Sequence, residues 1–199
     1  MMAIAVFCFS NVGLILLHKQ LTSLGSTDEE RKDLVALDFR KEGYTAADVE
    51  SLLSKYGPEG RTTYALYEAL DLAVFMWSYA AVLSMMLSVT AAVAPFEVLK
   101  LANLLPWAAA AADAVENSII LAMLATYPQH VAAVAPLAVT ASAAKWTLLS
   151  LTASTVAGLG FYCLYAAAKQ ASRPKQQQQR QQGQQQQGQA ARSQQKKQR

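Results

Sequence analysis

Hydrophobic residues gather in four long stretches of this chain, at about residues 1–17, 65–94, 104–127 and 134–167. A helix needs about 20 mostly apolar residues to cross the roughly 30 Å hydrocarbon core of a bilayer, and each stretch is close to that length. Because apolar and polar residues do not alternate with a period of two, strands are not predicted. The pattern predicts an all-α, four-helix transmembrane bundle, in which each helix satisfies its own backbone polar groups.

The first stretch is short enough to be compared with a cleavable secretory signal peptide. No Lys or Arg precedes it, and the first cation, Lys19, follows it, which is the wrong flank for such a signal. We therefore expect residues 1–17 to stay in the protein as a membrane span, with the signal peptide as the alternative. Because residue 1 already lies inside the apolar run, the span is expected to begin earlier than this sequence does.

One sizeable polar connection, residues 18–63, separates the first two stretches. Within it, Thr45 followed three residues later by Asp48 has the pattern of a capping box, and apolar residues then repeat on one helical face. A Gly-Pro pair at residues 57–58 predicts the end of that helix. We expect a short amphipathic helix at about residues 46–55 that packs under the loop at the mouth of the bundle, with a membrane-surface helix as the alternative.

The composition changes after the fourth stretch, because residues 169–199 are rich in Gln and hold eight of the 17 Lys and Arg but no acid. Such a segment has too few apolar residues to offset the entropy lost on ordering, so a disordered tail is predicted. Cations beside a helix end favour the cytosolic side, so with four spans both termini are expected in the cytosol. The tail is expected to act as a topology anchor, with weak binding to anionic lipid as the alternative.

No metal, cofactor or nucleotide site is predicted. Cys8 and Cys163 stand alone inside apolar stretches, and His18 and His130 lie at segment ends without a zinc-binding spacing. The chain also has no glycine-rich phosphate loop. The lipid bilayer is the expected partner, a lipid-like ligand and a membrane protein are further candidates, and no nucleic acid partner is predicted.

Five charged residues fall within or at the rims of the apolar stretches, where a lone charge at mid-membrane costs at least about 2.5–3.5 kcal/mol. A short connection at residues 127–130 makes the third and fourth stretches antiparallel. Asp113 lies sixteen residues before Gln129 and Lys145 sixteen after it, so at about 1.5 Å per residue both reach the same depth. We therefore expect Lys145 to form an ion pair with Asp113 or Glu116.

Other polar residues extend this expected pair into a cluster. Two carboxylates beside one lysine leave a charge without compensation, so one of the two acids is expected to hold a proton. In the second stretch, Glu68 is expected to reach the membrane surface. For Asp71 the sequence supports a side chain that faces the bundle and one that faces the surface equally well. The expected intramembrane polar cluster comprises Asp71, Asp113, Glu116, Asn117, Lys145 and Trp146.

Three motifs stand out: Gly-x-x-Gly-Arg-x-x-Tyr from residue 57, Asp-x-x-Glu-Asn from residue 113 and Lys-Trp from residue 145. In these motifs the chain resembles a family of small four-span integral membrane proteins whose members carry no assigned activity. The resemblance covers about residues 37–165 and implies the four-span fold and the positions of two groups of residues. One is the polar cluster, and the other is a loop-helix junction formed by Gly57, Gly60, Arg61 and Tyr64.

A weaker similarity, of size and span number alone, is to the emopamil-binding type of four-helix sterol proteins. The central cavity of those proteins uses acids, Asn and Trp. This chain has no His inside its predicted spans, which argues against sterol isomerisation.

Three functions are compatible with these residues. The leading hypothesis is a non-catalytic structural or assembly component, in which the buried ion pair fixes helix register. The alternative is a membrane cavity that binds a lipid-like ligand or conducts a proton or solute. An intramembrane enzyme that uses a carboxyl group as acid or base has the least support. No catalytic residue is assigned.

Overall fold

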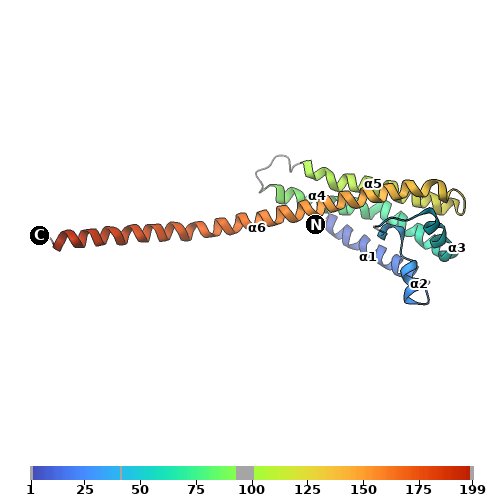
Figure 1. Ribbon diagram of the computed structural model, residues 1–199, viewed down its shortest axis with the longest axis horizontal. Coiled ribbons are helices and arrows are strands. Elements are labelled where there is room, and N and C mark those ends of the chain that lie inside the picture. Colours follow the sequence, from blue (N-terminus) through green and yellow to red (C-terminus); the bar gives the residue numbers. More distant parts are fainter. Residues whose placement is uncertain (1, 41, 93–100, 198–199) are drawn as a thin grey trace. The chain divides into compact units, whose positions relative to one another are not determined.

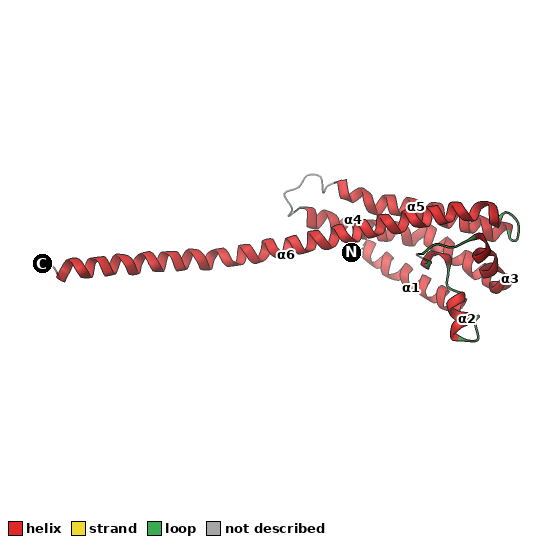
Figure 2. Ribbon diagram, viewed as in Figure 1, coloured by secondary structure: helices red, strands yellow, loops and turns green. Residues whose placement is uncertain are grey.

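The computed structural model of the chain describes residues 2–40, 42–92 and 101–197, with side chains up to residue 171. Within these residues all regular structure is helical (Figure 2). By length and composition, four segments can cross a membrane: Met2–Thr22, Ala46–Ala91, Leu101–Thr126 and Val131–Ala171. The all-α, four-helix architecture predicted from the hydrophobic pattern is therefore confirmed.

The chain divides into two compact units, Met1–Val156 and Ala157–Arg199. The first unit contains the helix bundle, in which α1 packs on α3 and α4 packs on α5 (Figure 1). The long helices are α1 (Met2–Thr22), α3 (Ala46–Leu70), α4 (Met76–Ala91), α5 (Leu104–Thr126) and α6 (Val131–Lys197). Only residues 131–156 of α6 belong to the first unit.

The second span begins with the predicted amphipathic helix. Thr45 and Asp48 form the capping box, and Leu52 and Leu53 are buried at the mouth of the bundle. At Gly57 the backbone takes φ 63° and ψ −175°, a conformation that is essentially restricted to glycine. The predicted helix and its end at this glycine are therefore confirmed, although a second helical segment follows at once within α3.

A π-helix, η2 (Asp71–Phe75), joins α3 to α4. Such a segment widens the helix by one residue and changes the direction in which its side chains point. Asp71 is the first residue of η2, so the irregularity falls on one of the expected polar residues. Hydrophobic periodicity alone does not predict this feature.

The polar connection between the first two spans folds back over the bundle. It contains the helix α2 (Asp28–Asp33), whose capping box is formed by Thr27 and Glu30, and the 3₁₀-helix η1 (Leu37–Phe39). Neither was predicted. Leu34 and the residues that follow it up to 38 are almost all buried, because this short apolar run packs on α3.

Two helix ends differ from the sequence prediction. α1 continues past the predicted end at residue 17 to Thr22, because Leu21 is fully buried in the core and extends the packed face by one turn. α6 begins at Val131, before the predicted residue 134, and continues to Lys197 through the segment predicted to be disordered. Gln, Ala, Lys and Arg are good helix formers, so a helix is compatible with this composition without an apolar core. The predicted end of the second span, at residue 94, lies outside the described residues.

The conformation of Gly57 leads to a stability prediction. Gly57→Ala should lower the free energy of unfolding in detergent by about 1–3 kcal/mol, because alanine is strained at this φ and ψ. The control is Gly158→Ala in α6, where an added Cβ meets no atom within 4 Å and where alanine is the better helix former. If the two substitutions change the thermal unfolding temperature equally, the backbone conformation at Gly57 does not require glycine.

Candidate functional site

A buried ion pair joins α5 to α6. The Nζ atom of Lys145 lies 3.1 Å from Oδ1 of Asp113 and 2.5 Å from Oε2 of Glu116. The three side chains are at most 5% exposed. The predicted pairing of Lys145 is therefore confirmed, and the lysine contacts both acids instead of one.

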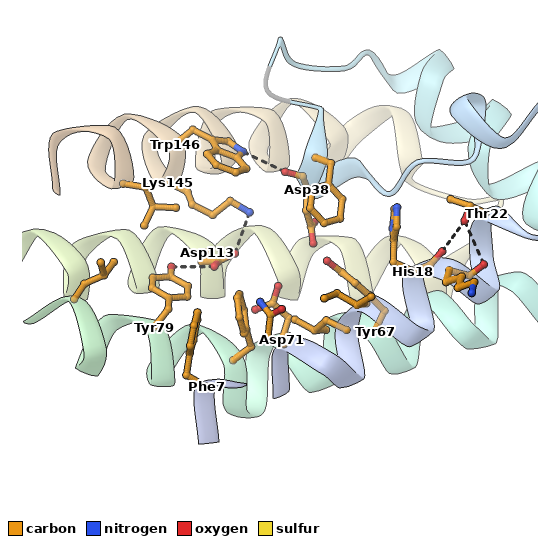
Figure 3. Close-up of a pocket in the computed structure, with 18 residues that line it drawn as sticks. Phe7, His18, Thr22, Asp38, Tyr67, Asp71, Tyr79, Asp113, Lys145 and Trp146 are labelled. Atoms are coloured by element: carbon orange, nitrogen blue, oxygen red, sulfur yellow. Dashed lines mark hydrogen bonds and ion pairs between the residues drawn. The ribbon is translucent and has the colours of Figure 1, made fainter. Parts of the chain in front are cut away.

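The second carboxylate oxygen of Asp113 accepts a hydrogen bond from Tyr79 on α4. The distance from the tyrosine Oη atom to Oδ2 of Asp113 is 3.0 Å, and the bond is buried (Figure 3). Asp113 thus has a partner for each oxygen, one from α4 and one from α6. This carboxylate connects three of the four spans.

Trp146 connects α6 to the folded polar connection. Its indole Nε1 atom donates a hydrogen bond to the backbone oxygen of Asp38 at 3.2 Å. The ring also lies 5.7 Å from Nζ of Lys145, within the range of a cation–π contact. Asn117, by contrast, is fully buried, and among the described residues its amide atoms meet no hydrogen-bond partner.

Asp38 is a site residue that the sequence reasoning missed. It lies on η1, outside the membrane-spanning segments, and its side chain reaches the space beside Lys145 (Figure 3). Burial raises the pKa of Asp38 to about 7, and this effect outweighs the positive charge of Lys145, which lowers it. The signal in the sequence was the apolar run Leu34 to Leu37, which places a hydrophobic anchor directly before this acid.

The residues of the second span are more buried than predicted. Asp71 is 4% exposed, and its Oδ1 atom has no hydrogen-bond partner among the described residues. Glu68 is fully buried, so the prediction that it reaches the membrane surface is wrong. The polar connection packs on this part of α3 through Tyr64, and such long-range packing cannot be read from helix periodicity.

The loop-helix junction is built for close packing. A Cβ atom on Gly60 would lie 2.8 Å from Cδ1 of Leu24, so no larger residue fits there without movement. Arg61 donates to the backbone oxygen of Leu53 at 2.9 Å and holds its guanidinium group 4.5 Å from the ring centre of Tyr127.

Tyr64 completes the junction from inside the core. Its hydroxyl accepts a hydrogen bond from the backbone nitrogen of Leu37 at 3.1 Å, and its side chain is fully buried. The junction residues Gly57, Gly60, Arg61 and Tyr64 are not among those that line the cavity described next. Their contacts place the polar connection, and with it Asp38, over the bundle.

A cavity of about 730 Å³ lies between the helices of the first unit. Its walls come from α1, η1, α4, α5 and α6, together with the end of α3 and η2. The wall contains three acids, Asp38, Asp71 and Asp113, and two lysines, Lys19 and Lys145. Most of the remaining wall is apolar, with Phe7, Leu14, Ile15, Phe75, Leu83 and Leu149 among its residues.

A histidine also lines this cavity. His18 was placed at a segment end by the sequence prediction, but α1 extends beyond it, so it lies inside the first span. The expectation that the spans contain no histidine is therefore wrong. In the part of the chain that the structure describes, no group of three His, Cys, Asp or Glu side chains is arranged to hold a metal ion.

Comparison with known proteins gives no family assignment. A scan against models of protein families, a search of curated proteins and a search of solved structures each found no match. What the site can do therefore follows from its own residues: a cation shared by two carboxylates, further buried acids and a largely apolar cavity.

The shared ion pair predicts a pattern of mutant stability. Lys145→Met should lower the free energy of unfolding by about 3–5 kcal/mol, because it leaves Asp113 and Glu116 buried without a cation. Adding Asp113→Asn and Glu116→Gln to this variant should restore most of the loss, as followed by thermal unfolding in detergent. Lys55→Met is the control, because its ion pair with Asp33 is largely exposed and should contribute less than about 1 kcal/mol. A triple variant no more stable than Lys145→Met would contradict this assignment.

The buried carboxyl group of Asp38 predicts a pH dependence. Its pKa is about 7 in the folded protein against a usual 3.8, so between these values the folded protein retains a proton that the unfolded chain has lost. The Asp38 contribution to stability therefore falls as the pH rises from about 4 to 7. Asp38→Asn should become more stable relative to the wild type across this window, which unfolding at several pH values measures. A constant difference would exclude the predicted titration.

Proposed function

We propose that this protein is a multi-pass membrane protein that binds a small amphipathic, lipid-like ligand inside its helix bundle. The observation that carries the proposal is the cavity of about 730 Å³ with the charged groups of Asp71, Asp113 and Lys145 at its wall. Small-molecule sites are commonly concave, mostly apolar and about 300–1,000 Å³ in volume, with a few polar groups that orient the ligand. The cavity has each of these properties.

The unpartnered acceptor on Asp71 supports binding over a purely structural role. A buried polar atom without a hydrogen bond is costly, so such atoms are rare unless a ligand or water satisfies them. Oδ1 of Asp71 is of this kind, and Asp71 is one of the residues that line the cavity. Glu68, Glu116 and Asn117 also have such atoms, but these residues do not line the cavity.

The ion pair of Lys145 supports a second role, that of a structural element. It links α5 to α6, and through Tyr79 the same carboxylate reaches α4. Buried ionic groups can fix helix register at some cost in stability. The two roles use different groups: Lys145, Asp113 and Glu116 hold the helices, while Asp38 and Asp71 remain for a ligand. We propose no reaction.

The proposed orientation places both termini in the cytosol and the polar connection on the opposite side of the membrane. The cations that follow the fourth apolar stretch support this orientation, because Lys and Arg beside spans favour the cytosolic side. Asp38, which the polar connection brings to the cavity wall, would then lie toward the side of the membrane away from the cytosol.

A cavity-filling substitution tests the proposed function. The full chain is purified from membranes in mild detergent, and bound amphiphiles are identified by native mass spectrometry. Leu149→Trp should abolish the bound species because Leu149 lines the cavity, whereas Leu151→Trp on the same helix should retain it because Leu151 is 51% exposed. The proposal fails if the wild type carries no amphiphile, or if both variants retain it equally.

A further inference from the structure

Buried acids outnumber buried cations in the first unit. Five carboxyl groups are at most 5% exposed, whereas Lys145 is the one buried cation among the residues whose side chains the structure describes. Its ammonium group is already engaged by Asp113 and Glu116. The carboxyl groups are those of Asp38, Glu68, Asp71, Asp113 and Glu116.

Two of these acids face the cavity without a charged partner. Oδ1 of Asp71 and both carboxyl oxygens of Asp38 are buried and have no hydrogen-bond partner among the described residues. Asp38 comes from η1 and Asp71 from η2, on different sides of the same space (Figure 3). Neither forms an ion pair within 4.0 Å in the described part of the chain. The cavity wall therefore holds two acids that have no cation of their own, and either acid gains a negative charge when it loses its proton.

We propose that the ligand carries a cationic amine head that binds between Asp38 and Asp71, with an apolar tail directed along Phe7, Phe75 and Leu149. This inference rests on the proposed function and names the chemical class of its ligand. An ammonium group offers up to three N–H donors and one positive charge, which matches two acidic side chains from different elements. The hydrocarbon tail is matched by the apolar part of the same cavity wall.

Other head groups match these residues less well. A carboxylate or phosphate head would meet three acids, Asp38, Asp71 and Asp113, against two cations, Lys19 and Lys145, at the cavity wall. A hydroxyl head brings a single donor and no charge, and hydrogen bonds to charged groups are stronger than neutral ones by a factor of about two. Lys145 does not attract an anion strongly because its charge is shared by two carboxylates.

A competition experiment tests the head group. The full chain in detergent is incubated with equal amounts of dodecylamine, dodecanol and dodecanoic acid at pH 7, and the retained species are counted by native mass spectrometry. The wild type should retain the amine over the alcohol by about tenfold or more, as expected for one charge-assisted bond. The variant Asp38→Asn/Asp71→Asn should lose this preference, whereas Asp28→Asn, at an exposed acid on α2, should keep it.

The outcomes separate this inference from the proposed function. If the wild type retains the alcohol or the acid as well as the amine, the cavity binds amphiphiles but the amine assignment is overturned. If it retains none of the three probes, the amine assignment fails. The proposed function then stands if the wild type carries a co-purified amphiphile and fails if it carries none. Because the first comparison uses the wild type, the result does not depend on whether the double variant folds.

Discussion

The ammonium group of Lys145 is the contact on which the polar interior of this bundle depends. Within hydrocarbon a lone charge is costly, and two carboxylates on α5 are brought to the lysine on α6 by the antiparallel arrangement of the two helices. The tyrosine of α4 adds a donor to the same group. The arrangement neutralises part of the charge and fixes how three spans face each other. Small residues on α5, Ala109 and Ala110, are fully buried and allow close approach nearby.

The cavity and the polar connection form one structural unit. Asp38 enters the bundle because three tether points hold its segment: the hydroxyl groups of Tyr56 and Tyr64 and the indole of Trp146 contact backbone atoms of residues 34–38. A hydrophilic loop thereby contributes an acid to a space formed mainly by membrane helices. The irregular segment η2 contributes another acid, Asp71, to the wall of the same cavity. Local deviations from regular helix thus concentrate where the acids gather, as is common at functional sites.

The sequence predicted the parts of this site that depend on regular helices. Equal spacing from the turn at residues 127–130 was enough to pair Lys145 with Asp113, because rise per residue fixes depth along a straight helix. The capping box at Thr45 and the helix break at Gly57 depend on neighbouring residues only, so they were also predicted from the sequence. Asp38 was missed because a loop that folds back over the bundle brings it to the site, and the burial of Glu68 was missed because it depends on tertiary packing. Such packing joins residues far apart in the chain and leaves no periodic signal.

The order of the charges along the chain has a consequence for membrane insertion. Glu68, Asp71, Asp113 and Glu116 all belong to the second and third spans, whereas the buried cation belongs to the fourth. A nascent chain with three spans in the membrane carries the acids without their lysine. The last span therefore completes the charge balance as well as the bundle. A chain that stops before Lys145 lacks the cation that offsets the cost of the acids of the second and third spans in lipid.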